Sequence, residues 1–405
     1  MRRTSALTLA QTLALTAVAL PAALPAAADI EIRGEARLGL GYNIANDGEP
    51  TYKDGKTRTV TREETVLVPT VDPETGVVTV REERQLVSRD VVTELGATDD
   101  LRAVSRIRFG VVMTGESDSG VSYGASIRAD NAPSGGTGPS ARTGQTAGEV
   151  FVSGAWGTLT FGDTDGADYA RVGDPIGNAT LTGLGDYNEL PFLSNGGGSD
   201  NDELQFLANP ETRPTVRYDY DYQGFGLSLS TDRTLDSVGV GGSYEHAFSD
   251  TASVKLGTGY YDFSAFEGEL NYYGAVDVPD GDEWAASLTG SYGAWQGGIG
   301  YASIDAGDLG QLDVMSLGAG ATFGPWTAMA YYSNVVSGDA LFGEAYDGND
   351  SFGASLAYDL GGGAQVKMGV ARTYGADAVG DPGDAQYAPG AEAITLADFG
   401  INMTF

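Results

Sequence analysis

Charged side chains gather in two parts of this sequence, and the chemistry they offer is electrostatic. Arginines of one parity recur in short stretches: Arg33, Arg37, Arg106, Arg108, Arg128 and Arg217. The segment 163–213 has two basic residues, Arg171 and Arg213, against ten acidic ones: Asp163, Asp165, Asp168, Asp174, Asp186, Glu189, Asp200, Asp202, Glu203 and Glu211. Opposite charges held apart create a field that orients water and dipolar molecules without breaking a bond.

Residues for catalysis are scarce. The chain has no Cys, which removes disulfides, thiolate nucleophiles and Cys-type metal sites. A hydrolytic triad needs a His, and His246, the single one, lies beside a predicted short turn with little room for a built site. The formal net charge of −33 disfavours nucleic acid as a partner, because a phosphate backbone requires a basic surface. We therefore expect a protein that is not an enzyme and does not bind nucleic acid.

Residues 1–28 are typical of a secretory signal peptide. Arg2 and Arg3 precede an apolar stretch, residues 6–24, which ends in a Pro-Ala-Ala-Ala sequence at 25–28. The alternative is a membrane anchor, but no stop-transfer charges follow the apolar stretch. We expect the mature chain to begin at Asp29 and to be exported.

The elements that must position the charges are strands, because apolar and polar residues alternate with period two along most of the mature chain. At the C-terminus, Ala397, Phe399, Ile401, Met403 and Phe405 share one parity. The pattern predicts sixteen strands, at residues 30–43, 101–115, 121–131, 147–154, 157–163, 214–222, 225–232, 236–247, 251–262, 282–292, 295–304, 312–323, 325–336, 350–359, 364–374 and 394–405.

The connections alternate between tight turns and mostly long loops, which with an even strand count is the pattern of an outer-membrane barrel. Aromatic residues beside the short turns would form an interfacial girdle: Trp156, Tyr222, Phe225, Phe248, Tyr292, Trp295, Phe323, Trp326 and Tyr358. A soluble sandwich or propeller is the alternative, but we see no linker between domains and no blade repeat. We predict an all-β fold, a 16-stranded antiparallel transmembrane β-barrel over residues 29–405.

Two long connections stand out. The stretch 44–100 is predicted to project from the first loop as a hairpin, with strands at 65–71 and 77–84 around a turn at 72–76. The acidic stretch 164–213 is the other, and it could fold into the bore.

Strand parity predicts which charges face the inside of such a barrel. Apolar residues such as Ile30, Ile32 and Ile107 would face lipid, which turns the arginines of the same strands inward. A charge on the lipid face at mid-membrane would cost about 2–4 kcal/mol. We therefore predict that the six arginines form a basic wall. If the 164–213 loop folds inward, Asp163 at its root and the first five carboxylates of the loop, Asp165, Asp168, Asp174, Asp186 and Glu189, would form the acidic half of a constriction.

Five blocks of sequence resemble the general porins of alphaproteobacteria, the Rhodobacter type. They read SRIRF (105–109), GESDSG (115–120), GASIRADNA (124–132), VFVSGAWGTLTFGD (150–163) and ADFGINMTF (397–405). The resemblance spans about 29–43 and 101–405, leaving 44–100 unmatched. It implies a homotrimeric, water-filled outer-membrane channel with an inward-folded third loop, in contact with lipid and lipopolysaccharide. It also implies that the terminal Phe405 is the signal for barrel assembly.

The function that follows is passive diffusion of ions and small hydrophilic solutes. A substrate-specific channel for sugars or organic acids is the alternative, and a structural barrel or adhesin is a further one. No cofactor is expected. The acidic cluster Asp277, Asp280 and Asp282 could hold Ca²⁺ or bridge it to lipopolysaccharide, as could the stretch 163–168, which lacks the acidic ligand of an EF-hand at position 12. Solvated acid is the favoured interpretation of both.

Overall fold

The computed structural model describes the mature chain in segments. These are residues 29–48, 56–71, 78–94, 101–130, 147–162, 164–175, 179–192, 194, 214–264, 266–267, 277–278, 280–305, 307, 310–338, 350–374 and 391–405. The predicted signal peptide lies outside them.

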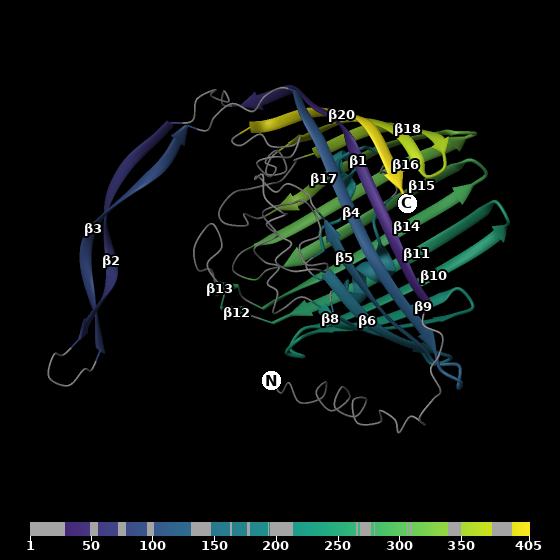
Figure 1. The fold of residues 1–405 in the computed structure, drawn as a ribbon, viewed down its shortest axis with the longest axis horizontal. Helices are drawn as coiled ribbons and strands as arrows, with labels where there is room; N and C mark the ends of the chain where they lie inside the picture. The colour runs from purple at the N-terminus through teal and green to yellow at the C-terminus, as the bar shows by residue number, and fades with distance from the viewer. Residues whose placement is uncertain are drawn as a thin grey trace.

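Sixteen antiparallel strands form one closed barrel, in which each strand pairs with its neighbours in sequence order (Figure 1). The first and last strands, β1 and β20, close the ring, and the backbones of Phe405 and Gly34 continue the ladder with two hydrogen bonds of 2.8 and 3.2 Å. The prediction of a sixteen-stranded barrel is thus confirmed. Its strands are β1 (Asp29–Gly48), β4 (Leu101–Glu116), β5 (Ser122–Asp130), β6 (Ala147–Gly154), β7 (Gly157–Gly162), β8 (Pro214–Tyr222), β9 (Phe225–Asp232), β10 (Val238–Ser249), β11 (Ala252–Phe263), β14 (Gly281–Tyr292), β15 (Trp295–Asp305), β16 (Gln311–Phe323), β17 (Trp326–Gly338), β18 (Asp350–Gly361), β19 (Ala364–Tyr374) and β20 (Ala391–Thr404).

Among the described residues, four further strands lie outside the barrel ladder. β2 (Lys56–Val71) and β3 (Val78–Glu94) pair with each other as a separate two-stranded sheet, drawn apart from the barrel wall in Figure 1. β12 (Phe266–Glu267) and β13 (Asp277–Val278) form a short second pair.

The barrel wall is apolar outside and polar inside. On β9, the side chains of Leu227 and Leu229 are 45% and 44% exposed, whereas Ser228 and Ser230 on the other parity are buried. Exposed apolar side chains and buried polar ones are the reverse of what a soluble protein shows. A barrel needs this arrangement when its outer surface meets hydrocarbon and its interior meets water. None of the helices in the described part of the chain has the length and apolar character needed to cross a bilayer.

Exposed aromatic rings mark the short-turn end of the barrel, as the sequence predicts. Trp295 packs edge-on against Phe323, Trp326 against Tyr358, and Trp156 is stacked beside Tyr218. Rings of this kind sit well at the boundary between headgroups and hydrocarbon.

The described residues of the acidic stretch, 164–175 and 179–192, pack against the inner face of the wall; we call them the inner segment. It contains one helical turn and a half, α2 (Ala167–Val172), and a 3-10 helix, η2 (Gly183–Asn188). Two apolar clusters join it to the wall: one around Val172, Leu190 and Phe192 against β14 and β15, the other around Leu184 against β17, β19 and β20.

Candidate functional site

The helix α2 lies directly on a row of glycines that face inward from β10 and β11. A Cβ atom built on Gly241 would stand 1.9 Å from the carbonyl oxygen of Ala167, and one on Gly257 would stand 2.3 Å from that of Arg171. Gly259 is equally close to Asp168. Only glycine allows backbone to approach backbone this closely, so the alternating glycines of these two strands determine where the helix can sit.

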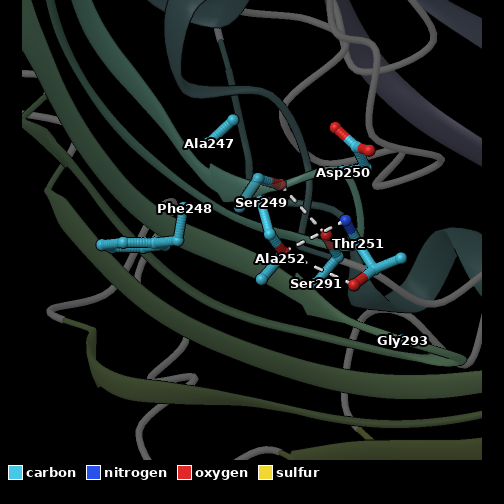
Figure 2. Close-up of a pocket in the computed structure, with 9 residues that line it drawn as sticks. Ala247, Phe248, Ser249, Asp250, Thr251, Ala252, Ser291 and Gly293 are labelled. Carbon is cyan, nitrogen blue, oxygen red and sulfur yellow. Dashed lines mark hydrogen bonds between the residues drawn. The ribbon is translucent and has the colours of Figure 1, made fainter.

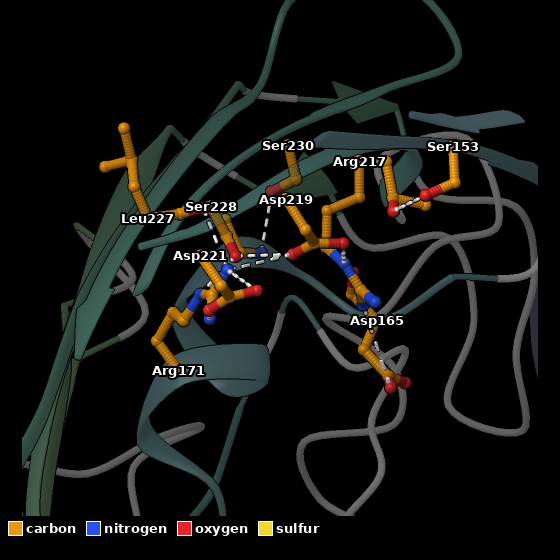
Figure 3. A network of polar contacts seen from close by, with 11 residues as sticks. Ser153, Asp165, Arg171, Arg217, Asp219, Asp221, Leu227, Ser228 and Ser230 are labelled. Atoms are coloured by element: carbon orange, nitrogen blue, oxygen red, sulfur yellow. Dashed lines mark hydrogen bonds and ion pairs between the residues drawn. The ribbon is translucent and has the colours of Figure 1, made fainter. Parts of the chain in front are cut away.

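Arg171 fastens the helix to β8 and β9 through four different groups (Figure 3). Its guanidinium donates to Ser228 Oγ at 2.6 Å, to Asp221 Oδ1 at 2.5 Å and to the carbonyl of Leu227 at 2.9 Å. Asp219 lies 3.7 Å away as an additional counter-charge. The Arg171 side chain is 11% exposed and Ser228 is buried, whereas the Asp221 side chain is 70% exposed, so the network is buried at its centre and reaches water at Asp221.

A second anchor holds the start of the helix. The backbone N–H of Ala167 donates to Ser230 Oγ at 2.9 Å, and Arg217 donates to the backbone oxygen of Asp165 at 3.1 Å. Arg217 is also paired with Asp219 at 2.9 Å. Arg217 therefore stands inside the barrel, as its parity predicts, but its charge is compensated and it holds the inner segment in place.

The far end of the inner segment is fastened to β1, β17 and β20. Asp398 Oδ2 accepts hydrogen bonds from the backbone N–H and the hydroxyl of Thr182, at 2.7 and 2.8 Å. Arg37 donates to the carbonyl of Leu181 at 3.0 Å, and the Tyr331 hydroxyl donates to the carbonyl of Leu184. The inner segment is thus fixed to the wall along its length, at β8–β11, at β14 and β15, and at β1 and β16–β20.

Arg37, Arg106 and Arg108 form the part of the predicted basic wall that the structure brings together. Arg37 stands opposite Arg106 in the register of β1 and β4, and Arg108 stands opposite Glu35. Arg106 donates to Glu35 at 2.7 Å, and the charges of Arg37 and Arg108 also act on this carboxylate. Lys367 of β19 belongs to the same group, since its charge interacts with those of Glu35 and Arg37.

Sequence reasoning missed Lys367, although the signal was present. Val366, Met368 and Val370 share the outward parity of β19, and the exposed side chains of Met368 and Val370 place Lys367 on the inner face.

The two other predicted arginines lie at the edge of this group. Arg128 of β5 stands opposite Gly110 in the register, level with Arg33, and its side chain is exposed. Arg33 is 64% exposed and pairs with Glu31 at 2.8 Å, four residues before Arg37 toward the short-turn end. We therefore place the centre of the basic wall at Arg37, Arg106 and Arg108.

Three of the predicted carboxylates surround Tyr169 of α2. The Tyr169 hydroxyl donates to Asp174 Oδ2 at 3.0 Å. Burial raises the pKa of Tyr169 most, and the negative charges of Asp174, Glu189 and Asp165 raise it further. Burial also raises the pKa of Asp174, to about 6, despite the hydrogen bonds from Tyr169 and from the backbone N–H of Leu190. Asp165 is 47% exposed, so this acidic group reaches the water inside the barrel.

The remaining carboxylates differ from one another. Asp168 of α2 is fully buried against Gly259 of β11. It therefore does not face the water inside the barrel, contrary to what the sequence led us to expect. The helix places this side chain toward the wall, because the residue faces the glycine row rather than the lumen. Asp163 and the side chain of Asp186 lie outside the described residues.

The candidate calcium ligands do not form a metal site among the residues that the structure describes. Within the described ranges, no three His, Asp or Glu side chains come together as ligands for a metal ion. The side chain of Asp277 lies outside them, Asp280 is exposed and Asp282 lies on β14. Bound Ca²⁺ therefore stays a prediction.

The short-turn end offers a hollow of about 570 Å³ between two turns (Figure 2). Its lining consists mostly of small hydroxyl and methyl side chains, with Asp250 the charged residue among them. Nearby, His246 stands on the outer face between the rings of Tyr244 and Phe248. Its surroundings are those of the aromatic girdle.

A closed sixteen-stranded barrel, apolar outside and polar inside, with a fixed segment packed against its inner wall, defines a channel protein of the outer-membrane type. The family to which this chain belongs is that of the Gram-negative porins, whose sequence profile matches residues 14–378. The protein is therefore an outer-membrane porin, a multi-pass β-barrel channel.

Individual relatives agree with this assignment. A porin of Rhodobacter capsulatus is 27% identical over 320 residues, which are 67% of this chain and 88% of the relative. A porin structure refined at 1.8 Å resolution is 21% identical, with a TM-score of 0.57 over 93% of this chain and 100% of that one. A mutant porin of Rh. blastica, 20% identical, gives a TM-score of 0.52 over the same shares. The predicted resemblance to Rhodobacter-type porins is confirmed, and the two structures share the fold.

Proposed function

We propose that this porin is a non-specific, water-filled channel, through which ions and small hydrophilic solutes diffuse down their gradients. The observation that carries the proposal is the inner segment. It is fixed along a polar inner wall and brings the carboxylates around Tyr169 into the same interior as Arg37, Arg106 and Arg108. A field between the two groups would orient water and dipolar solutes and would exclude apolar ones.

The proposal includes a homotrimer in the outer membrane, in contact with lipid and lipopolysaccharide, after removal of residues 1–28 as a signal peptide. It includes no cofactor and no catalytic step. Phe405 pairs with β1 at the barrel seam, a position that supports its predicted role in assembly.

Conductance in a planar bilayer tests the channel. We expect large, ohmic steps that close in groups of three and that small neutral sugars reduce while large ones do not. Steps that a single solute blocks at micromolar concentration would instead indicate a substrate-specific channel, and an absence of steps would indicate a structural barrel.

The basic wall has its own test, the reversal potential of the double variant Arg106→Ser and Arg108→Ser in a KCl gradient. A unit charge about 8 Å from a passing ion in water contributes about 0.5 kcal/mol. Losing two such charges should raise cation permeability and lower anion permeability about fivefold each, so the cation-to-anion permeability ratio should rise about 30-fold. The matched control, Lys56→Ser in β2 with Arg233→Ser at an exposed position between β9 and β10, removes the same net charge away from the basic wall. Equal reversal potentials for the two double variants would refute the assignment.

A further inference from the structure

The sheet formed by β2 and β3 has no role in the channel described above. Its strands have 16 and 17 residues, which corresponds to about 50 Å of extended chain. In the described part of the protein, neither outer edge of this sheet pairs with another strand. Isolated two-stranded sheets are marginally stable in water, and an unpaired edge is a template for a further strand. The outer edges of this sheet are therefore suited to pair with a further β-strand.

Both strands contain the same seven-residue pattern, Arg-Glu-Glu-x-x-Leu-Val, at residues 62–68 in β2 and 81–87 in β3. The register sets the two copies against each other symmetrically. Arg62 stands opposite Val87, Val68 opposite Arg81, and the central Thr65 opposite Arg84. Like charges directly opposite each other would destabilise an antiparallel pair, and within the pattern no two like charges stand opposite each other. The pattern is thus self-complementary when it pairs antiparallel.

The charge of the sheet also sets it apart from the rest of the chain. β2 and β3 together carry six basic and six acidic residues, whereas the whole chain has a formal net charge of −33. β2 alone has one excess positive charge, and β3 alone has one excess negative charge. Two copies of this protein therefore repel each other less through these strands than through an average surface, and the β2 edge attracts the β3 edge.

We propose that the outer edge of β3 pairs with the outer edge of β2 from a second copy of this chain, and repeats between the copies the register used within each hairpin. Copies in one membrane share their orientation, so their hairpins point the same way. The strand that lies antiparallel to β3 in a neighbouring hairpin is then β2. Its cross-strand neighbours would be those that β2 already has within its own sheet. The hairpin is an association element that links barrels through a continuous sheet.

Disulfide formation tests the register, because the natural chain has no Cys. Two tagged copies are expressed together, one with Thr65→Cys and the other with Arg84→Cys, and membranes are oxidised mildly. The matched control combines Thr70→Cys with Arg84→Cys. Thr70 stands opposite Thr79, so this pair is offset by five residues, or about 17 Å, which is too far for a disulfide. Conductance of each cysteine variant establishes that its barrel has folded.

We expect the linked heterodimer from the Thr65 and Arg84 variants to exceed that from the offset pair at least tenfold. A single chain carrying both substitutions should form the bond internally, which checks the register of the hairpin itself. Equal yields from the matched and offset pairs would overturn the proposal. So would a bond that forms only between two Thr65→Cys chains, because β2 would then pair with β2. Neither result depends on what the channel conducts.

Discussion

The position of α2 on the glycine row makes Gly241→Ala the most informative single change. The added Cβ would lie 1.9 Å from the carbonyl oxygen of Ala167, whereas ordinary contact begins near 3.4 Å. Since both are backbone-fixed atoms, the helix must move away from the wall by about 1.5 Å. That displacement stretches the bond from Ala167 N–H to Ser230, now 2.9 Å, and the bond from Arg171 to Ser228, now 2.6 Å.

The expected effect can be estimated from these two bonds. A neutral hydrogen bond contributes about 0.5–1.5 kcal/mol and one from a charged group about 1.5–3 kcal/mol. Losing both would weaken docking of the helix by roughly 2–4 kcal/mol, which is about 30- to 700-fold in the docking equilibrium. Because the helix moves toward the barrel axis, single-channel conductance should fall and open-channel noise should rise.

The neighbouring glycine supplies the control. A Cβ on Gly242 meets nothing within 4 Å, so Gly242→Ala makes the same chemical change in the same strand and should conduct like the natural protein. Gly257→Ala, which places its Cβ 2.3 Å from the carbonyl of Arg171, should reproduce the Gly241 effect from β11. If both tight positions gave natural conductance and noise, the close contact would not determine where the helix sits.

Two further predictions follow from the anchors of the inner segment. Arg171→Ala removes the donors to Ser228, Asp221 and Leu227 and should raise open-channel noise and admit larger sugars. Arg233→Ala, at an exposed site, should not, and identical sugar exclusion in the two variants would contradict the role of Arg171. The pKa of Asp174 is raised to about 6 in the docked segment, so the docked segment binds a proton more tightly than the undocked one. The protonated Asp174 therefore stabilises docking fully below about pH 4, and this stabilisation is lost as the pH rises through 6. Noise should therefore be greater at pH 7 than at pH 5, and Asp174→Asn should remove that difference; a natural-like pH dependence in Asp174→Asn would exclude this carboxyl.

The sequence was sufficient for the barrel because each strand has to satisfy two solvents at once. Period-two alternation places Ile30 and Ile32 in lipid and Arg37 in water, so strand existence, parity and the direction of the arginines can be predicted without tertiary information. The inner segment was harder, because its side chains meet the wall through contacts that span dozens to hundreds of residues. The burial of Asp168 and the hydrogen bond from Arg217 to Asp165 depend on where α2 lies, a position set by contacts between residues far apart in the sequence.

The alternation nevertheless contains a trace of the inner segment, at the places where it breaks down. Ile394 and Leu396 are fully buried on the inner face of β20, where a water-filled bore would favour polar residues, and they pack with Leu184 of η2. Where α2 lies against β10 and β11, four inner positions are glycines: Gly239, Gly241, Gly257 and Gly259. Two kinds of inward residue are thus anomalous for a simple channel, large apolar ones and runs of glycine. Both mark where chain rather than water covers the wall, and the polar remainder between them is the surface left for the pore.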